Sequence, residues 1–195
     1  MRVISGRFKG VALTTPKAGT RPTTDRTKEA IFSRLDSWGA LDDAHVLDLF
    51  AGTGALGVEA LSRGACDLVA VESSAPAAAL IAKTLNALKH NRSWESGMNA
   101  RVIKAKAEKY ASSAAAVVPF GVIFIDPPYV FSTEECNQLL ADLASRDLTD
   151  ERSVIVLERS TRSDEPTPPD GWEIVDRRDY GETAVYYICA VAQED

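Results

Sequence analysis

The sequence has few of the residues that build disulfide frameworks or metal sites. Its 195 residues include three cysteines, Cys66, Cys136 and Cys189, which are widely spaced and odd in number. They predict reduced, mostly buried thiols of a cytosolic protein. His45 and His90 are isolated, and no group of cysteines and histidines has the spacing of a zinc site. We therefore expect no metal, and structural or solvated roles for both histidines.

Long apolar runs are also missing. No stretch reaches the roughly 18 apolar residues that a membrane-spanning helix needs, and the first seven residues lack the apolar core of a signal peptide. These absences predict a cytoplasmic protein without membrane contact, which we expect to act as a monomer. With 45% hydrophobic and 26% charged residues, the composition is typical of one globular domain, alone or with an appendage.

Acidic residues outnumber basic ones, and the net charge is −6. The excess is uneven, because residues 1–28 hold seven lysines and arginines against one aspartate, a net of +6 that leaves the other 167 residues at −12. An acidic body argues against a general nucleic-acid binder, whereas a basic arm predicts contact with a polyanion from one side. A solvated basic tail is the alternative. The side chains expected to contact phosphates are Arg2, Arg7, Lys9, Arg21, Arg26 and Lys28.

The chain opens with a predicted hairpin and continues with alternating strands and helices. Residues 1–20 predict the hairpin around a glycine-bounded turn, and Thr24 or Asp25 can cap the helix that follows. Strands are predicted at 46–49, 68–71, 100–104, 122–125 and 154–157. Helices are predicted at 54–62, 75–88, 106–116 and 133–145.

This order of elements predicts an α/β fold. Strands that alternate with helices form a mostly parallel, doubly wound sheet. Two further strands, 172–175 and 184–188, flank a turn at Tyr180-Gly181 and predict an antiparallel hairpin at the sheet edge. We therefore expect two parts: a small basic extension over residues 1–24, which contacts the polyanion, and a main domain over residues 25–195.

A glycine-rich loop joins the strand predicted at 46–49 to the helix that follows it. Gly52 to Gly57 have the spacing G-x-G-x-x-G, in which glycines let the backbone turn sharply and approach a ligand at a helix N-terminus. Glu72 ends the next strand, 20 residues after Gly52, as expected of a carboxylate that accepts hydrogen bonds from ribose hydroxyls. The loop fits either NAD or S-adenosylmethionine (SAM).

Asp48 separates these two ligands, because it lies at the strand tip, four residues before Gly52. The pyrophosphate of NAD is anionic, so a carboxylate beside the loop would repel it. SAM carries an ammonium and a sulfonium, and a carboxylate attracts both. The loop therefore favours SAM, with NAD as the weaker alternative.

The apolar run 120–125 ends in Asp126-Pro127-Pro128-Tyr129, a rigid corner at a strand end. Each proline fixes φ and lacks an N–H, so the strand stops there, at the sheet edge where open α/β folds place their chemistry. The corner offers an acceptor-only carboxylate, free carbonyls and an aromatic ring. This set suits a flat base whose amino group must be held still, with Asp126, Pro127 and Tyr129 as the catalytic residues.

The chain resembles the bacterial RsmD-type methyltransferases nearly end to end. The similarity lies in Arg2–Gly6, Arg21–Arg26, Leu47–Gly54, Asp126–Tyr129 and Tyr180–Ala184. The resemblance implies a Rossmann-like SAM-dependent methyltransferase fold, with S-adenosylhomocysteine as the product of the cofactor. It also implies methylation of the exocyclic N2 of a guanine in small-subunit ribosomal RNA (rRNA), within the assembling small subunit.

The resemblance also assigns site residues. Asp126 can accept N1–H and N2–H of guanine together, whereas adenine presents an acceptor at N1. Tyr129 would stack on the extruded base. Two alternatives stay open: a DNA or RNA adenine-N6 methyltransferase, and a SAM-binding ribosome-assembly factor without catalysis. The implied cofactor-binding residues are Asp48, Phe50, Gly52 and Gly54 at the methionine end, Glu72 at the ribose, Ala107 at the adenine, and the neighbouring Thr53 and Ser73.

Overall fold

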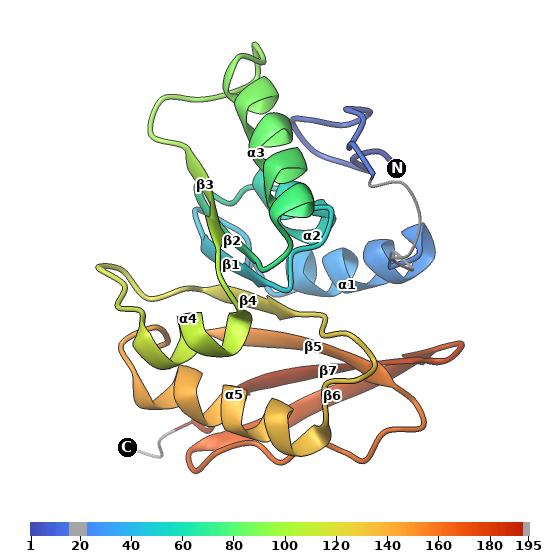
Figure 1. Ribbon diagram of the computed structural model, residues 1–195, viewed down its shortest axis with the longest axis vertical. Coiled ribbons are helices and arrows are strands. Elements are labelled where there is room, and N and C mark those ends of the chain that lie inside the picture. The colour runs from blue at the N-terminus through green and yellow to red at the C-terminus, as the bar shows by residue number, and fades with distance from the viewer. Residues whose placement is uncertain (16–22, 193–195) are drawn as a thin grey trace.

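The computed structural model describes residues 1–15 and 23–192, which form one seven-stranded sheet flanked by helices (Figure 1). The helices are α1 (Asp25–Ser37), α2 (Ala55–Ser62), α3 (Ala75–Lys89), α4 (Ala107–Ser113) and α5 (Thr133–Ser145). The strands are β1 (His45–Leu49), β2 (Asp67–Glu72), β3 (Asn99–Lys104), β4 (Val122–Ile125), β5 (Val154–Ser160), β6 (Trp172–Tyr180) and β7 (Thr183–Ala190). Every strand and helix predicted beyond residue 44 is present, with some ends shifted.

The sheet brings the carboxyl ends of five parallel strands to one edge. The strand order is β3-β2-β1-β4-β5-β7-β6; β1 to β5 are parallel, and β7 is antiparallel to both β5 and β6. The order reverses between β1 and β4, and open α/β sheets bind ligands at such a switch point. The predicted doubly wound sheet with an antiparallel C-terminal hairpin is confirmed.

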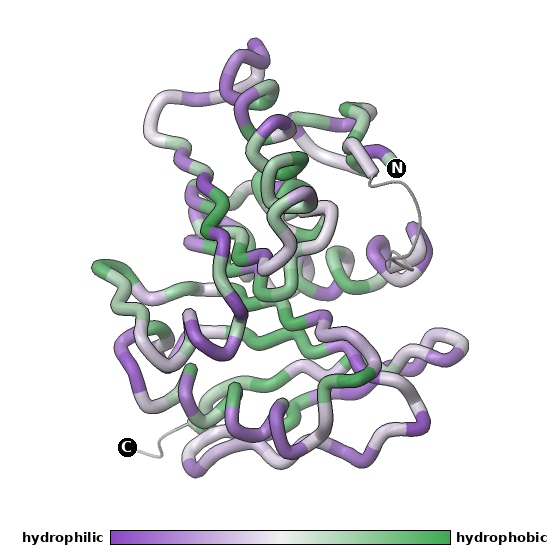
Figure 2. Tube along the Cα trace, viewed as in Figure 1, coloured by the Kyte–Doolittle hydropathy of each residue, from purple (hydrophilic) through white to green (hydrophobic). Residues whose placement is uncertain are grey.

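Two helical layers cover the sheet (Figure 1). Helices α1, α2 and α3 share a buried core with one face, and α4 and α5 share a second core with the other face. Because both faces are covered, β1 and β4 are apolar throughout except for His45, at the start of β1, and Asp48. Figure 2 shows hydrophobic residues concentrated along these central strands and hydrophilic residues in the outer loops.

Within residues 1–15, the N-terminal segment forms a short loop with one antiparallel bridge, between Arg2 and Ala12. The rest of the hairpin predicted over residues 1–20 lies outside the described residues. The N-terminal segment packs against the main domain, because Val3, Phe8 and Leu13 are buried in the core that α1, α2 and α3 share. The segment therefore packs as part of the main domain. It differs from the rest of that domain in its positive charge.

Gly6 makes this close packing possible. Its φ of +85° suits glycine, and a Cβ there would lie 1.9 Å from the carbonyl oxygen of Ser62 in α2. The N–H of Arg7 donates to that carbonyl at 2.8 Å, and the N–H of Phe8 donates to the Ser62 hydroxyl at 2.9 Å. Backbone N–H groups of the N-terminal segment thus donate hydrogen bonds to Ser62 at the end of α2. A carbonyl at the end of a helix has no hydrogen-bond partner within that helix.

Helix α1 begins after the predicted cap Thr24, whose hydroxyl accepts a hydrogen bond from the Thr27 N–H. Lys28 is only 1% exposed, and its Nζ lies 3.5 Å from Oε2 of Glu59 and 3.2 Å from the carbonyl oxygen of Arg2. The prediction that Lys28 contacts phosphate is therefore wrong, because its charge is balanced inside the protein.

The three cysteines are free thiols, buried or half-buried. Among residues 1–15 and 23–192, no group of three or more His, Cys, Asp or Glu side chains is arranged to hold a metal ion. In the same part of the chain, no helix combines the length and the apolar character needed to cross a membrane.

Candidate functional site

The glycine loop leaves β1 through three residues with positive φ. Phe50 has a φ of +57°, which non-glycine residues rarely adopt, and Gly52 and Gly54 follow at +57° and +77°. Gly54 is the N-terminal cap of α2, so the first turn of this helix faces the loop. Backbone strain of this kind clusters at ligand sites, and here it lies at the switch point of the sheet.

Two carboxylates hold this loop in place. Glu72, at the end of β2, accepts hydrogen bonds from the N–H groups of Gly52 (2.7 Å) and Ser74 (2.8 Å), one on each oxygen. Asp48 is 1% exposed and accepts a hydrogen bond from the N–H of Gly57 at 3.0 Å, in the first turn of α2. Both carboxylates therefore fix the geometry of the loop, and both border the same cavity.

The environment of Asp48 favours a cationic ligand. Burial raises the pKa of Asp48 well above its usual value, the Gly57 N–H opposes the rise, and the charges of Asp126 and Glu72 add to it. A cation beside this group would relieve the repulsion and stabilise the ionised form. The ammonium and sulfonium of SAM are cations of this kind.

These elements enclose a cavity of about 900 Å³ at the carboxyl edge of the sheet. The volume is in the range of pockets that hold nucleotide-sized ligands. The predicted catalytic residues Asp126, Pro127 and Tyr129 line it, so the glycine loop and the proline corner belong to one site. Gly54 caps α2 without lining the cavity. The predicted cofactor residues that line it are Asp48, Phe50, Gly52, Thr53, Glu72, Ser73 and Ala107.

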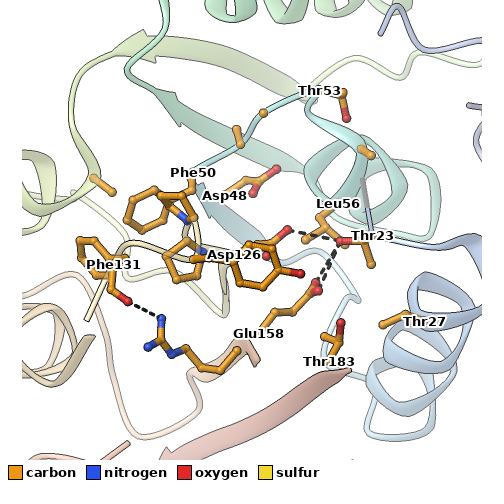
Figure 3. Close-up of a pocket in the computed structure, with 18 of the residues that line it drawn as sticks. Thr23, Thr27, Asp48, Phe50, Thr53, Leu56, Asp126, Phe131, Glu158 and Thr183 are labelled. Carbon is orange, nitrogen blue, oxygen red and sulfur yellow. Dashed lines mark hydrogen bonds between the residues drawn. The ribbon is translucent and has the colours of Figure 1, made fainter. Parts of the chain in front are cut away.

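Asp126 lies beside a second carboxylate, Glu158, near the end of β5. The hydroxyl oxygen of Thr23 is 3.3 Å from Oδ2 of Asp126 and 3.3 Å from both carboxylate oxygens of Glu158 (Figure 3). Burial raises the pKa of Asp126 to about 6, and the hydrogen bond from Thr23 opposes the rise. Burial first, and then the charge of Asp126, raise the pKa of Glu158 well above its usual value. We call Asp126 and Glu158 the carboxylate pair.

Phe131, which follows the proline corner in the sequence, holds the corner in place. The N–H of Phe131 donates to the carbonyl of Pro128 at 2.9 Å, and its ring packs edge-on against that of Phe50 with the centroids 5.1 Å apart. Nη1 of Arg159 donates to the carbonyl of Phe131 at 2.8 Å. Tyr129 remains 72% exposed at the cavity, so its ring is accessible to a ligand that approaches from solvent.

The sequence interpretation missed Thr23 and Glu158 as site residues. The register pairs Ile125 of β4 with Leu157 of β5, so the next residues lie side by side: Asp126 just after the end of β4 and Glu158 within β5. A charged residue directly after a buried apolar run was the signal that could have identified Glu158. Thr23 had no such signal, because its contact with Glu158 spans 135 residues.

The predicted phosphate-contacting residues lie in different environments. Arg2 and Lys9 are exposed on the N-terminal segment, and Arg26 is exposed on α1 and borders the cavity. Arg7 is less available, because its guanidinium forms an ion pair at 3.1 Å with a glutamate between α3 and β3. Arg21 lies outside the described residues.

Comparison with known proteins gives a consistent result. A family model described as conserved hypothetical protein 95 matches residues 1–189. The chain is 34% identical over 186 residues, 94% of its length, to 87% of the Escherichia coli (strain K12) protein named ribosomal RNA small subunit methyltransferase D. The solved structure of the Escherichia coli protein yhhF has a TM-score of 0.84 at 31% identity over 99% of both chains. A SAM-bound magnesium protoporphyrin IX methyltransferase from Synechocystis shares the fold, with a TM-score of 0.64 at 13% identity over 89% of this chain and 87% of that chain.

Proposed function

The chain belongs to the family described as conserved hypothetical protein 95, and we propose that it transfers a methyl group from SAM to the exocyclic N2 of a guanine in small-subunit rRNA. It is a methyltransferase, as its family and its named relative indicate. The observation that carries the proposal is the position of Asp126, an acceptor in the cofactor cavity beside an exposed aromatic ring. We further propose that the enzyme acts in the cytoplasm, as a monomer, on the assembling small subunit.

The residues around the cavity fit SAM, which when bound supplies an electrophilic methyl group on a cationic sulfur. Asp48 and the loop at Gly52 would hold the methionine end of SAM. The Asp48 carboxylate would attract the ammonium of SAM, and the N-terminus of α2 would attract its carboxylate. Each oxygen of Glu72 holds one loop N–H and has a second acceptor position for a ribose hydroxyl. Ala107, the first residue of α4, is 3% exposed and would present its backbone to the adenine.

The proposed reaction depends on positioning more than on a strong base. The N2 lone pair of guanine is delocalised into the ring, so the amino group must be aligned with the methyl donor and must lose a proton late. Asp126 would hold the amino group through its hydrogens and receive that proton. Pro127 would offer its carbonyl to the amino group, and Tyr129 would stack on the extruded base. The rigid corner keeps these three groups in a fixed relation.

One incubation tests the proposal. Small subunits from cells that lack this enzyme, mixed with the purified protein and methyl-labelled SAM, are expected to gain label in their rRNA. Digestion of the RNA and nucleoside analysis should place the label in N2-methylguanosine. Label in N6-methyladenosine would contradict the guanine assignment. Transfer to no RNA would instead indicate a SAM-binding protein without catalysis.

Two exposed cations are expected to contribute directly to rRNA affinity. Replacing Lys9 and Arg26 with alanine removes two proposed phosphate contacts, so binding should weaken roughly tenfold at physiological salt. The slope of log affinity against log salt should fall in magnitude by about two, because fewer counterions are released. Filter binding at several salt concentrations measures both quantities.

Arg146 and Arg152 provide a matched control, since they are exposed beyond the end of α5 and before the start of β5. Their double alanine variant loses the same charge at the amino end of β5, outside the cavity lining, so the salt slope should stay at the wild-type value. Equal losses in both variants would mean that net charge, and not the proposed surface, sets the affinity. Deleting the whole N-terminal segment is a poorer test, because Val3 and Phe8 belong to the core.

A further inference from the structure

Two carboxylates share one hydroxyl in the cavity. The Thr23 oxygen is 3.3 Å from one oxygen of Asp126 and from both oxygens of Glu158 (Figure 3). A hydroxyl has one hydrogen to donate, so it can serve only one of these three oxygens at a time. The carboxylate pair therefore keeps acceptor positions for hydrogens that a ligand brings into the cavity.

The fold places this pair side by side at the sheet edge. Ile125 and Leu157 are paired in the register and fully buried, and Asp126 and Glu158 follow them in the same direction. Glu158 is 5% exposed, and its neighbour across the sheet is the buried Val185 of β7. Apolar surroundings disfavour a carboxylate unless donors compensate it. Its presence among cavity-lining residues therefore indicates a ligand that supplies donors.

Guanine brings two donors to its Watson–Crick edge, N1–H beside N2–H, whereas an isolated amino group would occupy only one carboxylate. We propose that Glu158 accepts the hydrogen of N1 while Asp126 accepts a hydrogen of N2, so that Glu158 selects guanine as the target base. The inference rests on the proposed methyl transfer to guanine. The sequence interpretation assigned the recognition of both N1–H and N2–H to Asp126. The inference divides this recognition between Glu158 and Asp126.

The same pair disfavours bases with an acceptor at N1. Adenine presents a ring nitrogen lone pair at this position, which would face an oxygen of the ionised Glu158 carboxylate with no hydrogen between them. A buried acceptor left without a donor lowers the rate by roughly tenfold to a hundredfold. The preference for guanine thus comes from a missing hydrogen bond as well as from the one that forms.

2-Aminopurine separates this role from the rest of the site, because it keeps the N2 amino group but has an acceptor at N1. Once the methylated guanine has been located in the rRNA, small-subunit rRNA is ligated from segments with guanine or 2-aminopurine at that position and is then assembled into particles. The wild type should methylate guanine about 100-fold faster than 2-aminopurine. Glu158→Gln should reduce this preference at least about tenfold, since the Gln amide N–H can donate to N1 of 2-aminopurine. An unchanged preference overturns the inference.

The ratio of the two rates distinguishes recognition from structural damage, because a damaged site slows both substrates alike. Glu173→Gln is the matched control: Glu173 is exposed on β6, and this variant should keep the wild-type preference. If Glu158→Gln does not fold, Glu158→Asp provides the test by drawing the carboxylate back. It should slow guanine methylation at least about tenfold, with SAM affinity unchanged in calorimetry. A wild-type rate for Glu158→Asp overturns the inference.

The wild-type protein keeps the two proposals apart. If it methylates no guanine in the particles, the proposed function fails, and the role of Glu158 fails with it. If it methylates guanine but Glu158→Gln keeps the full preference over 2-aminopurine, only the role of Glu158 fails.

Discussion

Replacing Asp126 with alanine is expected to slow methyl transfer to rRNA by about a thousandfold. The variant loses the acceptor that would orient the amino group and take its proton, while the proposed SAM-binding residues of the glycine loop remain. We therefore expect SAM affinity to stay within about threefold of the wild type. Single-turnover transfer of labelled methyl measures the rate, and calorimetry measures the affinity.

The pH dependence of the wild type provides a second check on Asp126. Its pKa is raised to about 6 by burial, so the carboxylate takes up a proton as the pH falls through that value. The rate should therefore fall as the pH drops below about 6, by about tenfold for each pH unit. Asp147→Ala, which changes an exposed aspartate after α5, should retain both the rate and the profile. Lost SAM affinity with intact chemistry in Asp126→Ala would contradict the proposed role.

Replacing Glu59 with alanine is expected to lower the free energy of unfolding by about 3–5 kcal/mol. Glu59 is fully buried in α2, where its two oxygens accept the N–H groups of Ile4 (2.9 Å) and Ser5 (3.0 Å). It also pairs with Nζ of Lys28 at 3.5 Å and with Nε of Arg63 at 3.0 Å. Its loss would leave Lys28 charged and buried without an acidic partner. Chemical denaturation at neutral pH measures the change.

Glu29→Ala is the matched control for Glu59→Ala. Glu29 also pairs with Arg63, at 3.0 Å, but its side chain is 48% exposed, so its removal should change stability by less than about 1 kcal/mol. Adding Lys28→Met to Glu59→Ala removes the uncompensated charge and should recover at least about 1 kcal/mol. A loss below about 1 kcal/mol for Glu59→Ala alone would show that the buried ion pair is not required.

The strands and helices could be predicted because their signals are local. A strand covered on both faces reads as an apolar run, and the runs of β1 and β4 end in the glycine loop and the proline corner. Those same endings identified Asp48 and Asp126 as cavity residues. The packing of the N-terminal segment could not be predicted in this way, because the burial of Val3 and Phe8 depends on α2, far along the chain.

Lys28 shows why charge alone led to a wrong prediction of phosphate contact. It precedes Ile31, Phe32 and Leu35 by three, four and seven residues, which puts it on the buried face of α1. Helical periodicity therefore contained its position, although nothing nearby in the sequence revealed the Glu59 partner in α2. The bridge from Thr23 to the carboxylate pair is hidden for the same reason: it joins segments that meet only in the folded sheet.

The contacts that α2 makes with the N-terminal segment also order events during synthesis. Residues 4–8 bond to Glu59 and Ser62, which lie 54 to 57 positions later in the chain. At typical translation rates, about 3–10 seconds pass between the synthesis of residues 4–8 and the synthesis of α2, the helix that they contact. Until then Val3 and Phe8 have no core to enter. The N-terminal segment therefore reaches its packed position only after α2 has formed.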